Sequence, residues 1–283
     1  MYLGTNVYII NSMRSLKAYI VTMMLMLTAT AASAQCPFHN TAFSTGEYLS
    51  YNLYFNWQFV WVKVGSASFN TVKTHYDGQP AYKGSLITRT SQKADKFFIM
   101  RDTLLCYNTL DLVPLYYRKG AYEGKRRNVD EVFYSYPGGR CQVKQHRKHT
   151  NGTHSWEKHV YNYCVYDMMS IFLRARSFNP TGWAKGYDVN FRIVDGNSEY
   201  PAKIKYQGKQ NIKADDGHTY RCLKLAYMEN EHGKGFKKIV DFFISDDSNH
   251  IPIRLDMHLK FGSAKAFCSG MKGIRNNITS RVK

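Results

Sequence analysis

Apolar and polar residues alternate with a period of two through most of the chain, which is the pattern that β-strands produce. Between Tyr48 and Phe55 this alternation predicts one strand, with Leu49, Tyr51 and Leu53 on the same face. Further strand-like or apolar stretches cover residues 59–69, 81–90, 103–108, 113–118, 129–136, 140–148, 154–161, 187–194, 199–206, 210–214, 220–228, 237–245 and 251–261. We therefore expect a mainly β protein.

Glycine-containing turns separate several of these stretches. Asp77-Gly78 lies between two apolar runs, Pro137-Gly138-Gly139 ends another, and Asn151-Gly152 is the strongest short hairpin signal in the chain. Tight turns of this kind join antiparallel strands. The pattern therefore predicts a large curved antiparallel sheet or an open barrel.

One segment, residues 167–177, has helical spacing. Its apolar residues are Met168, Met169, Ile171, Phe172, Leu173 and Ala175. Asp167 is a credible N-cap, and Asn179-Pro180 stops the helix. We expect this internal helix to pack its apolar face on the sheet; residues 94–100 predict only a short helical turn.

The N-terminus has the three parts of a secretory signal peptide. Met13-Arg14-Ser15-Leu16-Lys17 is basic, residues 18–27 are apolar, and Ala32-Ser33-Ala34 is a small-residue cleavage site. Translation starts at Met1 or Met13. We expect residues 1–34 to be removed near Ala34, which leaves one β-rich domain over residues 35–283. No later apolar stretch has the length of a membrane span.

A lipoprotein is the competing interpretation of this N-terminus, because Cys36 follows the small residues. Gln35 stands where a lipidation motif needs a small residue, and Ser33 where it needs an aliphatic one. The sequence therefore favours an unlipidated, exported protein.

The net charge of the chain is +18, and removing Arg14 and Lys17 with the signal peptide leaves 18 − 2 = +16. Such a charge favours acidic partners, namely lipid phosphates or anionic glycans, and export disfavours nucleic acid. Solubility alone is the alternative explanation. The 22 Tyr, 16 Phe and 4 Trp are mostly core residues of a sheet, although tyrosine also suits a groove for amphiphilic ligands.

Six cysteines, Cys36, Cys106, Cys141, Cys164, Cys222 and Cys268, are spread along the chain without a C-x-x-C spacing. Export permits disulfides, and six cysteines allow 15 pairings. Several of these cysteines lie in strand-like runs, where cysteine behaves as a small buried hydrophobe. We expect one disulfide at most.

Four histidines surround the Asn151-Gly152 turn: His146, His149, His154 and His159. A two-residue turn would bring His149 and His154 close together across the hairpin. Two imidazoles are too few for a zinc site, which takes three or four ligands. An exposed basic hairpin tip is the favoured interpretation, and we expect no metal and no cofactor.

Asp246 and Asp247 form the other candidate cluster, followed by Arg254. A carboxylate pair can perform acid–base chemistry, but Ser, Asp and Asn residues around these positions are typical of a tight turn. Arg254 is a candidate partner for one of the aspartates. We assign these residues a structural role and name no catalytic residue, because no nucleophile, phosphate loop or dinucleotide motif is present.

Three groups of residues, in this order, resemble the DUF3108 family of exported bacterial proteins of unknown function. Thr45-Gly46-Glu47-Tyr48-Leu49-Ser50-Tyr51 and Val64-Gly65-Ser66-Ala67 resemble its opening, and the Asp167-led helix its middle. Phe243-Ile244-Ser245-Asp246-Asp247, Ile251-Pro252-Ile253-Arg254 and Leu259-Lys260-Phe261-Gly262-Ser263-Ala264 resemble its close. The resemblance covers about residues 44–268. It implies a periplasmic protein of the Gram-negative envelope and supplies no catalytic residue.

Three functions are compatible with these features. The first is non-enzymatic binding of an amphiphilic or anionic ligand, a lipid or a glycan, in the concave face of the sheet, partly covered by the helix. The alternatives are an envelope glycan hydrolase with converging carboxyl groups, and a scaffold that pairs with envelope proteins through a sheet edge.

Overall fold

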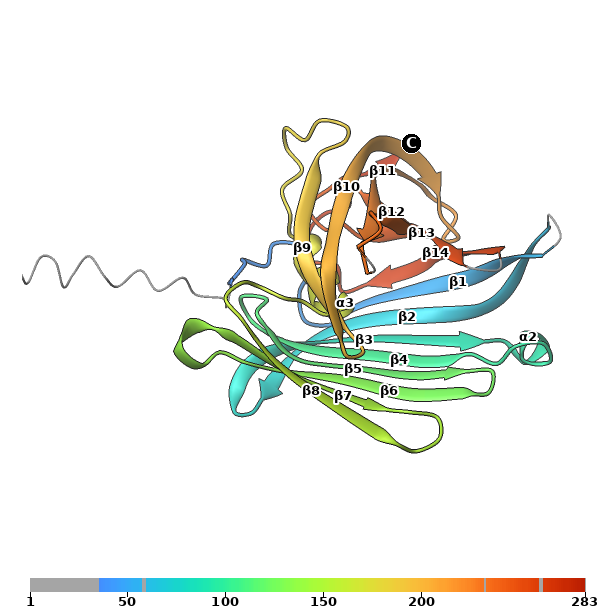
Figure 1. The fold of residues 1–283 in the computed structure, drawn as a ribbon. Helices are drawn as coiled ribbons and strands as arrows, with labels where there is room; N and C mark the ends of the chain where they lie inside the picture. Colours follow the sequence, from blue (N-terminus) through green and yellow to red (C-terminus); the bar gives the residue numbers. More distant parts are fainter. Residues whose placement is uncertain (1–35, 58–59, 232, 260–261, 283) are drawn as a thin grey trace, which may run out of the picture.

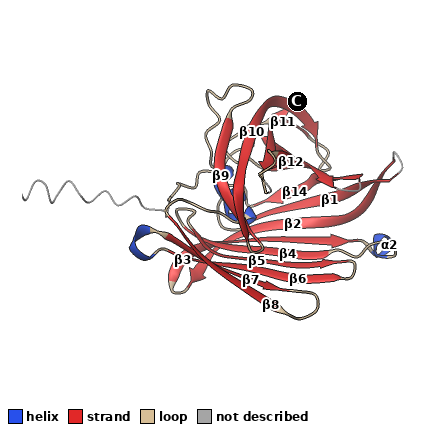
Figure 2. Cartoon of the chain, in the orientation of Figure 1, coloured by secondary structure: helices blue, strands red, loops and turns tan. Residues whose placement is uncertain are grey.

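The computed structural model describes residues 36–57, 60–231, 233–259 and 262–282. The predicted signal peptide, residues 1–34, lies outside the described residues. Strands account for most of the described chain, as predicted (Figures 1 and 2). None of the helices in the described part combines the length and the apolar character needed to cross a membrane.

A single antiparallel sheet contains all the strands that are described. They are β1 (Glu47–Trp57), β2 (Val60–Tyr76), β3 (Gln79–Thr90), β4 (Arg101–Thr109), β5 (Pro114–Glu123), β6 (Arg126–Ser135), β7 (Cys141–Lys148), β8 (His154–Tyr161), β9 (Asp188–Asp195), β10 (Ser198–Lys213), β11 (Thr219–Glu229), β12 (Lys237–Ser245), β13 (Pro252–Leu259), β14 (Gly262–Lys272) and β15 (Arg281–Val282). Their spatial order is β8-β7-β6-β5-β4-β3-β2-β1-β14-β13-β12-β11-β10-β9, with β15 on β11. The sheet is not closed, because β8 and β9 form its two ends.

The sheet folds over on itself, so that its inner face becomes the core (Figure 1). The buried residues alternate as predicted in β1, where Leu49, Tyr51 and Leu53 are buried while Tyr48 is 44 % exposed. The turn between β9 and β10 reaches the opposite end of the sheet, where Gln145 Nε2 donates a hydrogen bond of 2.6 Å to the Gly196 carbonyl. This contact draws the two halves of the sheet together without a ladder between β8 and β9.

Helix α3 (Met168–Ala175) lies between the two halves of the sheet, which confirms the predicted internal helix (Figure 1). Asp167 is its N-cap, since Oδ1 accepts hydrogen bonds from the backbone N–H groups of Met169 and Ser170. Leu173 is fully buried and packs over Gly84, where a Cβ would lie 3.4 Å from its Cδ1 atom. Glycine at this position therefore lets the helix approach β3.

Two further short helical segments are described: α2 (Gln92–Asp95), in the loop that joins β3 and β4, and the 3₁₀ turn η1 (Pro137–Gly139). The helical turn expected over residues 94–100 overlaps α2 only at residues 94 and 95, because the helix begins at Gln92 and ends at Asp95.

The structure lengthens several of the predicted strands, β2 among them, which continues to Tyr76, and two further differences have a clear cause. Residues 199–206 and 210–214 form one strand, β10, because a bulge between Tyr206 and Lys209 lets the ladder with β11 continue. Strand β14 was not predicted, because its many small residues give a weak alternation. Its pairing with both β1 and β13 decides its conformation.

One disulfide is present among the described residues, between Cys36 and Cys164, with a Cα–Cα distance of 6.2 Å. The other four cysteines are buried thiols. The disulfide occupies the Cys36 sulfur that lipidation would require.

Candidate functional site

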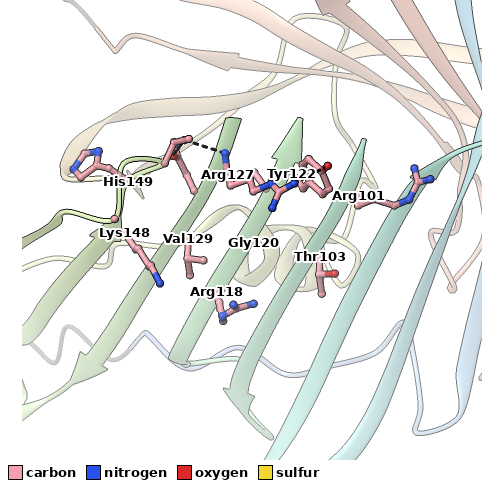
Figure 3. A pocket seen from close by; sticks show the side chains of 13 residues that line it. Arg101, Thr103, Arg118, Gly120, Tyr122, Arg127, Val129, Lys148 and His149 are labelled. Carbon is pink, nitrogen blue, oxygen red and sulfur yellow. Dashed lines mark hydrogen bonds between the residues drawn. The ribbon is translucent and has the colours of Figure 1, made fainter. Parts of the chain in front are cut away.

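A hollow of about 480 Å³ lies on the outer face of β4–β7, the face opposite α3 (Figure 3). Its floor contains Thr103, Gly120 and Val129, which are direct cross-strand partners in β4, β5 and β6. Alternation along the strands places these residues on the face that the core does not use. We call this site the basic hollow, because Arg101, Arg118, Arg127 and Lys148 line it.

Each of the three arginines has a defined position beside this floor. Arg101 forms an ion pair with Asp95, and the hydrogen bond from Arg101 lowers the pKa of that carboxyl group. The Arg127 guanidinium lies 4.1 Å from the centre of the Tyr122 ring, and its Nη2 atom donates a 2.8 Å hydrogen bond to the phenol oxygen. These contacts restrict the orientation of both side chains.

The position of the Arg118 side chain depends on the absence of a side chain at Gly120. A Cβ at position 120 would lie 3.1 Å from Arg118 Nη1, so the guanidinium occupies the space that glycine leaves open. The charge of Arg118 is only partly compensated, because Glu131 Oε1 lies 4.0 Å from its Nε atom.

Lys148 closes one end of the hollow, opposite Val129 in the neighbouring strand. The Lys148 side chain has no hydrogen bond or ion pair among the described residues. None of the described residues that line the hollow carries a carboxyl group. The hollow is therefore a cationic surface with one uncompensated ammonium group.

Hydrogen bonds join the turn between β7 and β8 to strand β6 at the edge of this site. Thr150 Oγ1 accepts a 2.9 Å hydrogen bond from the Arg127 backbone N–H and donates one of 2.9 Å to Asn128 Oδ1. The residues on this turn are therefore held against β6.

A chain of hydrogen bonds lies next to the hollow on the same face. Glu131 accepts from Tyr116 at 2.5 Å and contacts His146 Nδ1 at 2.8 Å, while His146 Nε2 lies 2.7 Å from His154 Nδ1. Burial and the hydrogen bond to Glu131 raise the pKa of Tyr116. The pKa of Glu131 is lowered overall, because hydrogen bonds from Tyr116 and His146 outweigh the raising effect of burial.

The expected approach of His149 and His154 does not occur. The Thr150–Gly152 turn has three residues, so His149 lies opposite Thr153, to whose carbonyl its backbone N–H donates. His149 and His154 then differ by one register position and lie on opposite faces. His154 meets His146 instead, and no group of three or more potential metal ligands occurs in the described part of the chain.

Asp246, Asp247 and Arg254 have separate partners. Asp247 Oδ1 accepts hydrogen bonds from Ser245 Oγ at 2.9 Å and the Asn249 backbone N–H at 3.0 Å, the geometry of a tight turn. Asp246 forms ion pairs with Lys209 at 2.8 Å and Arg221 at 2.7 Å. Arg254 pairs with Asp256, and the expected pairing with Asp246 or Asp247 was wrong.

The expected position of the ligand was the concave face of the sheet, whereas the two hollows described here lie elsewhere. Core side chains from both halves of the sheet and from α3 fill that face. The basic hollow, and a second one of about 320 Å³, both lie on the outer face. Folding the sheet over converts its concave side into the hydrophobic core.

Sequence reasoning missed the cations of the basic hollow. The available signals were the charged run at residues 125–127 and the alternation of Tyr116, Arg118, Gly120 and Tyr122 in β5. These signals place side chains on a face of one strand. The register of four strands is needed to bring the cations together.

Solved structures that resemble this one share about a tenth of its sequence. A β-barrel-like protein of the domain of unknown function DUF1849 from Brucella abortus has a TM-score of 0.53 at 10% identity, over 83% of this chain and 100% of that chain. This likeness supports the barrel-like fold. A "putative exported protein with YmcC-like fold" from Bacteroides fragilis has a TM-score of 0.35 at 10% identity, over 84% of this chain and 100% of the other.

A "putative lipoprotein" from Parabacteroides distasonis has a TM-score of 0.36 at 11% identity, over 84% of this chain and 99% of the other. No curated protein matches the sequence. The profile of the family described as "Protein of unknown function (DUF3108)" matches residues 50–269, most of the chain. The chain therefore belongs to the DUF3108 family.

Proposed function

We propose that this protein is a non-enzymatic binding protein of the cell envelope that holds the anionic group of a lipid or a glycan in the basic hollow. The observation that carries the proposal is the convergence of Arg101, Arg118, Arg127 and Lys148 around a floor of short side chains. None of the described lining residues carries a carboxyl group, so only Asp95 and Glu131, which lie outside the lining, offset part of this charge.

The physical basis is the excess of positive charge. Like charges held close together on a protein surface repel one another. A bound anion offsets this repulsion, because it attracts each of the surrounding cations. Arginine guanidinium groups bind carboxylates and phosphates through two parallel hydrogen bonds. Gly120 and Thr103 keep the floor low enough for a ligand group to reach the guanidinium of Arg118.

An envelope location fits the chemistry of the chain. The Cys36–Cys164 disulfide is typical of proteins in oxidising compartments. Outside the cytoplasm, a protein with this net charge encounters lipid and glycan anions. These features support export to the periplasm, as the predicted signal peptide does.

The alternative functions have weaker support. A glycan hydrolase needs two carboxyl groups about 5–10 Å apart across its cleft, and the described lining of the basic hollow has none. A scaffold would use the free edge of β8, but Glu157 and Lys158 place charges there, which oppose edge-to-edge pairing.

The test is binding of two probes measured by calorimetry: digalacturonate, and vesicles containing phosphatidylglycerol. We expect the wild-type protein to bind at least one probe, and the double variant Arg118→Ala, Arg127→Ala to bind it at least about tenfold more weakly. Lys213→Ala, which removes an exposed cation from β10, is the matched control and leaves binding unchanged.

Equal binding by the wild type and the double variant would show that another surface is used. Failure of the wild type to bind either probe would also contradict the proposal. Added salt weakens binding at this exposed site, because ions screen exposed charges.

A further inference from the structure

The second hollow adjoins the basic hollow on the same outer face. It has a volume of about 320 Å³ and lies over β1, β2, β3 and β14, where Ser50, Ser68, Ile87 and Arg89 line it. Ile87 is the direct cross-strand partner of Thr103, which belongs to the floor of the basic hollow. The two hollows therefore meet between β3 and β4.

One cross-strand row of residues forms the floor of both hollows. Each residue is paired with the next in the ladder, in the order Gly270, Ser50, Ser68, Ile87, Thr103, Gly120, Val129 and Lys148. Most of these side chains are short. Gly270 leaves room for the Ser50 side chain, whose hydroxyl donates a 3.3 Å hydrogen bond to the Gly270 carbonyl. Eight strands at a spacing of about 4.8 Å make this groove roughly 34 Å long.

The adjacent row on one side of the floor carries arginines. Arg89 and Arg101 are direct cross-strand partners at the junction of the two hollows. Arg127 continues the row, because it is opposite Tyr122, and the Met100–Glu123 bridge and the Thr103–Gly120 pair place Tyr122 opposite Arg101. The arginines thus follow the groove from β3 to β6, while Asn52 and Ser66 occupy the same row over β1 and β2.

Arg89 lacks the compensation that Arg101 has. Arg101 is paired with Asp95, whereas the exposed Arg89 side chain has no hydrogen bond or ion pair among the described residues. Like charges directly opposite each other on a sheet are destabilising. Glu131, the acidic residue on the far side of the floor, is already bonded to Tyr116 and His146.

We infer that the groove binds one linear acidic polysaccharide, which lies across the strands with its anionic groups along the arginine row. This inference rests on the proposed function and specifies its ligand class. A row of mostly short side chains, beside a row that carries arginines from β3 to β6, fits an extended chain, whereas a membrane surface would first meet the side chains that protrude.

A nucleic acid fits the groove less well than a glycan. Single-stranded nucleic acids are bound through bases that stack on exposed aromatic rings. Among the described tyrosines that line the two hollows, Tyr51 is buried and the Tyr122 ring is covered by the guanidinium of Arg127. Tyr48, at 44 % exposure, is the one open ring among them, whereas stacking of successive bases needs several. Sugars carrying carboxylate or sulfate groups require only the cations and the hydroxyl groups of the floor.

The test is calorimetric titration with oligogalacturonates from the dimer to the octamer. We expect the affinity to rise with chain length until the oligomer spans the groove. Arg89→Ala, at the junction, weakens octamer binding about tenfold and leaves dimer binding unchanged, because the dimer fits within the basic hollow. Ser68→Tyr, which raises the floor of the second hollow, has the same length-dependent effect, and Lys213→Ala has none.

The results separate this inference from the proposed function. If dimer and octamer bind equally well and Arg89→Ala has no effect, the extended groove is wrong while anion binding in the basic hollow stands. Binding of phosphatidylglycerol vesicles without binding of any oligogalacturonate overturns the polysaccharide but not the proposed function. Tighter binding of oligothymidylate than of an oligogalacturonate of equal charge also overturns it, and failure of every probe overturns both.

Discussion

Arg176 and Glu47 form a fully buried, bidentate ion pair, with Nη–Oε distances of 2.5 and 2.8 Å. Glu47 begins β1, and Arg176 follows the last residue of α3. Arg176 Nη2 also donates a 3.0 Å hydrogen bond to the Asn249 carbonyl in the turn before β13, and its own carbonyl contacts His250 Nδ1. Three segments that are far apart in sequence therefore meet at one charge pair.

We predict that Glu47→Gln destabilises the protein by about 3–5 kcal/mol, because it leaves the Arg176 charge buried without a counter-ion. Denaturation by urea, followed by circular dichroism, measures the change in the free energy of unfolding. The matched control is Glu199→Gln, which breaks the Arg192–Glu199 pair, where the arginine side chain is 38% exposed. The control costs less than about 1 kcal/mol, and equal losses for the two variants would contradict the prediction.

The fully buried Asp167 carboxyl group makes stability depend on pH. Burial raises its pKa to about 6, although hydrogen bonds from Ser170 and Tyr134 oppose the shift. The unfolded chain releases this proton near pH 3.9. Between these values the native state binds more protons, so this contribution is fully present below about pH 4 and is lost as the pH rises through 6.

Asp167→Asn keeps an oxygen that can cap α3 but removes the titration. The stability of the wild type relative to this variant should therefore fall, by an amount on the order of 3 kcal/mol, between pH 4 and pH 7. Urea denaturation of both proteins over this range measures the difference. Asp102, whose pKa burial also raises to about 6, is present in both proteins and cancels. A constant or rising difference would disprove the assignment.

The cysteines should react in two classes. Cys36 and Cys164 are joined, and the four thiols of Cys106, Cys141, Cys222 and Cys268 are fully buried. Burial also raises the pKa of Cys141 to about 11 and that of Cys222 to about 12, which disfavours the reactive thiolate. A thiol reagent should modify none of the four in the native protein and all four after denaturation; rapid labelling of the native protein would contradict this burial.

Removing the disulfide should destabilise the protein. Its closed loop spans 128 residues in sequence, so the oxidised unfolded chain loses much conformational freedom. We predict that the Cys36→Ser, Cys164→Ser double variant loses about 2–4 kcal/mol of unfolding free energy in urea denaturation. Unchanged stability would mean that the bond does not restrict the unfolded chain appreciably.

Gly65 allows β2 and β3 to approach. A Cβ at this position would lie 2.2 Å from the Arg89 carbonyl oxygen, which is a backbone atom and cannot turn away. Gly65→Ala should therefore cost on the order of 2–3 kcal/mol, as expected when a residue forces the backbone apart. Ser66→Ala is the neighbouring control, and thermal unfolding compares the two variants. A Tm for Gly65→Ala equal to that of the control would show that the strands adjust freely.

The sequence determined the local features of this protein. Period-two alternation identified most of the strands, and the Asp167 cap and the Asn179-Pro180 stop marked the helix, because these signals depend on residues that are near one another in the chain. The ordered motifs also indicated the family. The predicted contact between His149 and His154 across the β7–β8 turn was wrong. The turn has three residues and not two, and this one additional residue brings His154 to His146 instead.

Tertiary structure decided which of these local features meet. The pairing of β1 with β14, the cross-strand row from Gly270 to Lys148 and the Arg176–Glu47 pair all depend on the register between distant segments. Alternation shows which side chains of a strand lie on the same face, but it does not show which face of the folded sheet becomes the core. Folding the sheet over packs core side chains on its concave side. It also brings together, on the outer face, cations that no single sequence motif connects.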